Sequence, residues 1–237
     1  ISLAFFVMFS FMFTQMLHFQ LVREKSAFEA ALRFLPLPLG LMPSAANSDK
    51  LCERFGSNNV VSVGLAIIGT AMLIFTTVDV STAYETLALI FFLIGVGMGL
   101  TMAPSTTMVM DSMPHDKAGV GSATNDASRE VGGAFGIAIV GSAVNEIYQR
   151  EMVIPNGLES HSGVVSESFP AAIRIGNELV AQGNMLGIEL IENAQLAFVE
   201  GMTGAAAISA LVAIVNAVLV KLYMPKRSVS KAGGDVV

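Results

Sequence analysis

The sequence predicts an all-α integral membrane protein: a bundle of six transmembrane helices with an extended, extracellular amphipathic segment. Composition is the first observation behind this class. Hydrophobic residues make up 53% of the 237 residues and charged residues 14%, and the mean hydropathy is +0.65, whereas a soluble domain is typically about 25% charged. The second observation is that the apolar residues form long runs without charge. The third is a long acidic segment between the last two runs.

Six stretches of the chain contain no charged residue: residues 1–22, 34–48, 55–78, 86–110, 131–145 and 201–220. A transmembrane helix needs about 20 mostly apolar residues, with about 17 as a lower limit. The second and fifth stretches are shorter, but each passes 20 residues when its flanking helical turns are included. We therefore expect six spanning helices.

Prolines and glycines predict kinks and close helix contacts within individual runs. Prolines in the second and fourth runs predict kinks, which spanning helices tolerate. Closely spaced glycines predict places where helix backbones approach each other in lipid: Gly95, Gly97 and Gly99 in the fourth run, and Gly132, Gly133 and Gly136 in the fifth.

The sequence divides into four parts. Residues 1–147 contain the first five predicted spans, 148–200 form the outer segment, 201–222 the last span, and 223–237 a cytoplasmic tail. The outer segment carries seven Glu and two Arg, and its apolar residues recur at helical spacing, interrupted at Gly183 and Gly187. A pair of surface helices on the outer membrane face is the structure we expect.

The joining segments predict the orientation. Residues 48–59, 111–117 and 221–237 together carry seven Lys or Arg, against five in the segments expected on the other side. Cytoplasmic loops of membrane proteins are enriched in these residues, so we place the first set in the cytoplasm.

Asp126, Arg129 and Glu130 stand in the fifth predicted span. A charge at bilayer depth costs at least about 2.5 kcal/mol on insertion scales, so such residues usually face a protein interior or a water cavity and mark an ion or substrate path. Asp126 and Glu130 are four residues apart and share one helix face. This favours proton or cation handling. The alternatives are a buried structural ion cluster and a helix half-submerged at the cytoplasmic surface.

Other chemistry finds little support in the sequence. The motifs H-E-x-x-H, G-x-S-x-G and the phosphate-binding Walker sequence are absent, so enzyme activity is not favoured. The single Cys52 excludes a disulfide framework, and the three histidines are too scattered to suggest a metal site. We expect no cofactor, no metal and no nucleic-acid partner.

Four stretches resemble a known family. HFQ at 18–20 with SAFEAALRFLP at 26–36 is similar to a YLQ…SxxxAGLxxLP signature, and LCERFG at 51–56 to a cytoplasmic loop motif. AGVGSA at 118–123 with GGAFG at 132–136, and FVEG at 198–201, complete the set. In this order they resemble the 14-span drug:proton antiporters, the EmrB/QacA-type branch of the major facilitator superfamily.

The resemblance implies that the chain is the C-terminal six-helix half of a multi-pass protein of the bacterial cell (inner) membrane. The chain opens at Ile1 inside an apolar run, which agrees with this expectation. Its partners would be the missing N-terminal half of the same polypeptide, protons, small amphipathic substrates and the lipid bilayer. The implied function is proton-coupled multidrug efflux of amphipathic or cationic compounds by alternating access. An exporter of a lipid, siderophore or other metabolite, or a truncated non-transporting membrane protein, are the alternatives.

The same resemblance implies site residues. The first and fourth runs would line the central cavity, and the residues expected there are Thr14, Gln15, His18, Phe19, Met98, Met102, Ser105, Thr106 and Thr107. The alternative is that the hydroxyls bond back to their own helix and the Met residues only pack. Glu53, Arg54 and Gly56 would form the cytoplasmic loop motif, although Glu53 replaces the family's Asp.

Overall fold

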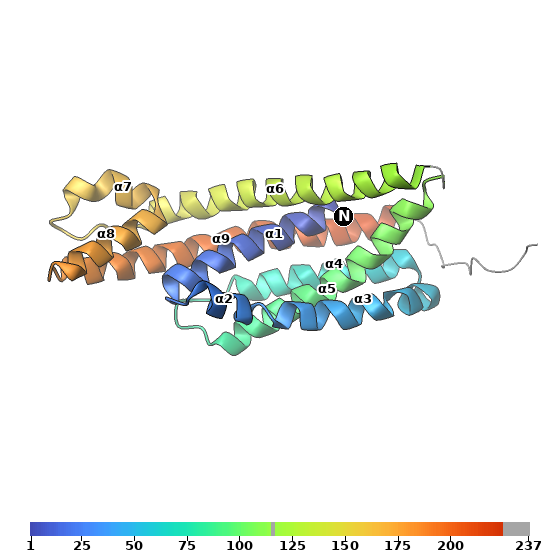
Figure 1. The fold of residues 1–237 in the computed structure, drawn as a ribbon, viewed down its shortest axis with the longest axis horizontal. Coiled ribbons are helices and arrows are strands. Elements are labelled where there is room, and N and C mark those ends of the chain that lie inside the picture. The colour runs from blue at the N-terminus through green and yellow to red at the C-terminus, as the bar shows by residue number, and fades with distance from the viewer. Residues whose placement is uncertain (115–116, 225–237) are drawn as a thin grey trace, which may run out of the picture.

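A computed structural model describes residues 1–114 and 117–224, and the regular structure of these residues is helical, without a strand. Figure 1 shows long, roughly parallel helices. The helices, in chain order, are α1 Ser2–Leu17, α2 Ala27–Arg33, α3 Pro36–Phe55, α4 Ser57–Phe75, α5 Tyr84–Asp111, α6 Ala118–Glu151, α7 Ser162–Glu167, α8 Phe169–Ala181 and α9 Leu186–Tyr223. A π-helical turn, His18–Val22, extends α1. Most of the expected tail 223–237 lies outside the described residues.

Five of the described helices are long and apolar enough to cross a membrane: 2–22, 57–75, 84–111, 118–151 and 186–223. The chain is thus a multi-pass membrane protein. The second predicted span forms α3, which has 20 residues. Its second half carries Asp49, Lys50, Glu53 and Arg54, and these charges explain why α3 does not reach the hydropathy of the other five.

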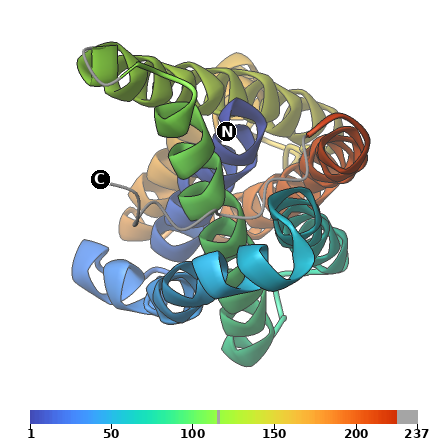
Figure 2. The ribbon, with the colours of Figure 1, turned by 90° about the vertical axis from the view of Figure 1, so that its right-hand side faces the viewer.

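Close helix packing follows the predicted glycines. The backbone of α5 at Gly95 and Gly99 lies against the carbonyl groups of Leu37 and Leu41 in α3, and α6 meets α1 in the same way at Gly132 and Gly136. A side chain at any of these positions would collide with the facing backbone. In the end-on view of Figure 2, α6 lies along the top of the bundle, α3 crosses its lower part, and α5 runs upward past α3 towards the start of α6.

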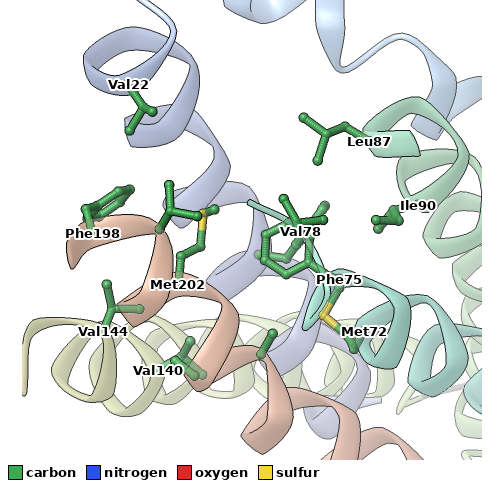
Figure 3. Packing of buried hydrophobic residues seen from close by; sticks show 14 of the residues in the cluster. Val22, Met72, Phe75, Val78, Leu87, Ile90, Val140, Val144, Phe198 and Met202 are labelled. Carbon is green, nitrogen blue, oxygen red and sulfur yellow. The ribbon is translucent and has the colours of Figure 1, made fainter. Parts of the chain in front are cut away.

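The hydrophobic core joins α9 to α6 and α4. Figure 3 shows Phe198 and Met202 of α9 beside Val140 and Val144 of α6, with Phe75 of α4 close by. These side chains are all buried. Burial of such apolar groups against each other fixes the relative positions of α4, α6 and α9.

The joining segments group as the sequence predicted. Lys221 near the end of α9 donates to Asn59 at the start of α4, and Ser112 after α5 lines a cavity together with Met224. At the opposite end, Arg23 donates to the carbonyl oxygen of Thr82 at 2.6 Å. The described parts of the expected set, residues 48–59, 111–114 and 221–224, therefore share one end of the bundle.

The outer segment differs from the expectation at one glycine. Gly183 has φ +79° and turns the chain between α8 and α9, as predicted. Gly187 does not break the helix: it lies inside α9, where a Cβ atom would meet the carbonyl oxygen of Gly176 in α8 at 2.5 Å. The helix then continues through residue 200, because the apolar spacing of 186–198 runs without interruption into the last predicted span.

Candidate functional site

Arg129 connects three helices. Its Nη1 lies 3.7 Å from Asp126 Oδ1 within α6, and its Nη2 donates to Thr106 Oγ1 of α5 at 3.0 Å. Its guanidinium carbon lies 5.3 Å from the centre of the Phe5 ring of α1, a distance at which a cation and an aromatic face attract. These contacts hold the positive charge in one place.

Asp126 and Glu130 point away from the bundle. The Asp126 side chain is 65% exposed, against 22% for Arg129, and Glu130 is also exposed. Glu130 belongs to none of the ion pairs among the described residues. Carboxylates on a spanning helix are unstable in contact with lipid, so this face of α6 needs either water or another protein surface.

A cavity of about 260 Å³ lies beside Arg129. Three of the nine expected cavity residues, Met102, Thr106 and Thr107 of α5, line it together with Leu41 and Ala45 of α3. Thr107 Oγ1 also donates to the Ala103 carbonyl oxygen at 3.2 Å. Its hydroxyl therefore bonds back to its own helix, which is the alternative given above for the hydroxyls of this run. These residues and Arg129 form the part of the expected site that the structure brings together.

The expected polar residues of α1 do not line this cavity. Thr14 lines a separate cavity, with Phe13 and Tyr148, and Gln15 and His18 are buried. Thr14 Oγ1 donates to the carbonyl oxygens of Ser10 and Phe11 of its own helix, at 3.1 and 3.0 Å. Gln15 is fully buried, and its amide nitrogen lies 3.3 Å from Met202 Sδ of α9. Packing satisfies the Gln15 side chain only in part, because its Oε1 has no hydrogen-bond partner within the described part of the chain.

His18 and Phe19 are also buried. His18 Nε2 accepts a hydrogen bond from Arg23 Nε at 3.1 Å, and the Phe19 ring contacts the rings of Phe34 and Phe91. The π-helical turn brings His18 and Arg23, five residues apart, into this contact. His18 and Phe19 therefore fix the end of α1 and do not line the cavity beside Arg129.

Two expected residues of α5 lie elsewhere. Met98 is fully buried in the core. Ser105 lines a different cavity, of about 400 Å³, with Thr101 of the same helix and Asn216 of α9. The expected set is thus divided between the core and separate cavities.

The accessible face of α1 carries the residues that sequence reasoning missed. Phe9, Met12, Phe13 and Met16, together with Phe34, line an open apolar hollow of about 590 Å³, here called the α1 hollow. Their spacing of three and four residues places them on one helix face, and this signal was present in the sequence. It could not be interpreted there, because most residues of α1 are apolar.

The loop motif provides a turn between helices. Gly56 joins α3 to α4 with φ +85° and ψ 142°, a conformation almost confined to glycine. Glu53 and Arg54 are exposed, and the Arg54 guanidinium lies 5.2 Å from the Phe55 ring centre. The motif thus requires its glycine for the backbone, and both of its charges remain accessible.

Comparison with known proteins gives consistent matches. The family model described as Major Facilitator Superfamily matches residues 1–137. The chain is 25% identical over 204 residues to the multidrug efflux pump LfrA of Mycolicibacterium smegmatis, an alignment that covers 86% of this chain and 40% of that protein. It is 25% identical over 210 residues to the tetracenomycin C resistance and export protein of Streptomyces glaucescens, covering 84% and 38%.

A third relative is the methyl viologen resistance protein SmvA of Salmonella typhimurium, 26% identical over 161 residues, with 68% of this chain and 32% of that protein covered. The chain therefore spans about two fifths or less of the length of these relatives.

Proposed function

We propose, because the chain belongs to the Major Facilitator Superfamily, that it acts as the C-terminal half of a proton-coupled drug exporter of the 14-span EmrB/QacA type. The matched relatives are multidrug and antibiotic efflux proteins, and the chain covers about 40% of the first of them. In this proposal α3 is the sixth span, the protein lies in the bacterial inner membrane, and the N-terminal half of the same polypeptide covers the exposed face of α6.

The arrangement of Asp126 and Glu130 beside Arg129 is the observation that carries the proposal. Two exposed carboxylates on a spanning helix attract a cation, and a proton bound to either one weakens that attraction. Arg129 is held by Thr106 and Phe5, so it stays fixed while the occupant of the carboxylates changes. Proton and cationic substrate would therefore compete for one site, as antiport requires, while the two halves rock around it.

The α1 hollow supplies the apolar part of the proposed substrate site. It includes Ile137 of α6, which follows Glu130 by seven residues, or about 10 Å along the same side of the helix. An amphipathic cation can place its charge near Glu130 and its apolar body against Phe9, Met12 and Phe13. Methyl viologen, against which one relative confers resistance, is an aromatic organic cation, with a positive charge on each of its two rings.

Efflux measurements in the intact protein test the proposal. Glu130→Gln and Asp126→Asn should each abolish export of an organic cation driven by a proton gradient, or restrict it to fewer cations. Glu146→Gln is the matched control, since Glu146 lies farther along α6 and pairs with Arg150 at 3.6 Å. Unchanged export and unchanged pH dependence in both site variants would refute the coupling role.

A further inference from the structure

A further cavity lies at the outer end of the bundle, away from the carboxylate site. Its volume is about 260 Å³, and helices α1, α6, α8 and α9, with the last residue of α7, form its walls. We call it the outer cavity. Phe13, Asn145, Tyr148, Glu167, Phe169 and Phe198 are among its lining residues.

The aromatic wall of the outer cavity is held in place. Tyr148 is buried, and its hydroxyl donates to the Val165 carbonyl oxygen at 2.7 Å, which ties α6 to α7. The Phe169 ring stacks on Phe198 with 4.2 Å between centroids, and Tyr148 meets Phe169 edge-on at 5.9 Å. Rings fixed in this way lose little freedom when a flat ligand binds against them.

The polar part of the lining is acidic. Glu167 ends α7 and is exposed, and it takes part in none of the ion pairs among the described residues. Asn145 of α6 adds an amide oxygen that can accept or face positive charge. The segment 148–200 that carries Glu167 has seven Glu and two Arg, so its field attracts cations.

We propose that the outer cavity is a second binding site, which takes a flat aromatic cation of about two fused rings. Phe13, which is 44% exposed, is the most accessible of these lining aromatic residues, and aromatic faces attract cations and stack on flat rings. Glu167 supplies the opposite charge. This inference rests on the proposed export function, which supplies the substrate and its route. Phe13 lines both the α1 hollow and the outer cavity and so connects the two. A substrate leaving the hollow past Phe13 enters the outer cavity next, so the cavity is the last site before release.

Thiol protection in the intact protein tests this site. The one cysteine of this chain, Cys52, is buried and is replaced by Ser together with any cysteine elsewhere in the protein. Asn145→Cys then places a reactive thiol in the outer cavity, and Ser160→Cys places one outside it. The probe is N-methylquinolinium, with uncharged 2-methylnaphthalene for comparison.

The probe should slow maleimide labelling at position 145 and leave labelling at position 160 unchanged. Glu167→Gln should weaken this protection about two- to five-fold, the range of a single partly exposed ion pair. Glu192→Gln, which removes a charge from the same segment outside the cavity, should not. Equal labelling with and without probe, or equal protection by the uncharged compound, would overturn the proposal.

Failure here is separable from failure of the export proposal. If the cation is exported but position 145 is never protected, the outer site is wrong and export stands. If position 145 is protected with the expected dependence on Glu167 but no proton-driven export occurs, the outer site stands and the proposed function is wrong.

Discussion

Arg129 of α6 donates a hydrogen bond to Thr106 Oγ1 of α5 at 3.0 Å, and this contact joins the predicted coupling residues to the predicted cavity. Thr106→Val keeps the shape of the side chain and removes the acceptor. Because a hydrogen bond to a charged group contributes about 1.5–3 kcal/mol, the variant should be less stable and its guanidinium less confined. The unfolding temperature of the intact protein in detergent measures the first effect.

Thr107→Val is the matched control for that prediction. Thr107 is adjacent and exposed, and it bonds only to the Ala103 carbonyl oxygen of its own helix. We expect this variant to unfold at the original temperature. If the two variants behave alike, the Arg129–Thr106 contact contributes nothing specific.

Met98 and Met102 should respond differently to substitution by alanine, although they lie one turn apart on α5. Met98 is fully buried in the core, so Met98→Ala should lower stability by about 2–5 kcal/mol and reduce the amount of protein. Met102 lines the cavity beside Arg129, so Met102→Ala should change which compounds are exported more than how much protein is made. Export profiles normalised to protein amount provide the comparison. A loss that tracks expression in both variants would place Met102 in the core as well.

The packing of α6 on α1 predicts a difference between two glycines of one helix. A Cβ atom at Gly136 would collide with the Phe6 backbone, whereas at Gly141 the nearest neighbour is 3.9 Å away. Gly136→Ala should therefore cost about 1–3 kcal/mol through overpacking, and Gly141→Ala should cost nothing. Thermal unfolding of the two variants checks this. Equal unfolding temperatures would mean that α1 and α6 are farther apart than described.

The turn between α4 and α5 predicts a response to acid. Asp79 accepts hydrogen bonds from the Ser81 backbone N–H and from the hydroxyls of Ser81 and Thr82, and these bonds lower the pKa of Asp79. A lowered pKa in the folded state means that the stabilisation is present above the unfolded pKa and is lost as pH falls through the folded value. Amide hydrogen exchange of residues 79–82, corrected for the intrinsic effect of pH, should therefore speed up in acid. Asp79→Asn should exchange fast at every pH, and an unchanged rate in this variant would contradict the assignment.

Hydropathy and charge were sufficient to predict the five described helices that could cross a membrane, because a span must be long, apolar and nearly free of charge. The second predicted span forms α3, which does not reach that hydropathy. The glycine contacts of α5 and α6 were also predictable, since only glycine allows two backbones to approach so closely. The length of α9 was not, because residues 186–200 combine helical spacing with three exposed Glu residues, and such a pattern suits a surface helix equally well.

The orientation of α1 was the main limit on predicting the site. Thr14, Gln15 and His18 share a face that polar character alone would assign to a water cavity, yet the structure packs this face into the bundle. Neighbouring helices decide which face is buried, and they are not visible in the sequence of α1. The carboxylates differ: their charge makes contact with lipid so unfavourable that the sequence alone indicated water or protein beside them.

Proton release on substrate binding tests the central claim, competition between a proton and a cation at Asp126 and Glu130, most directly. The intact protein in detergent and weak buffer is mixed with a saturating organic cation near the pH at which half of its export activity remains. The account predicts that binding acidifies the solution, by up to about one proton per bound cation, and that Asp126→Asn combined with Glu130→Gln abolishes the release. Cation binding without proton release in the unaltered protein, or the same release in the double variant, would contradict it.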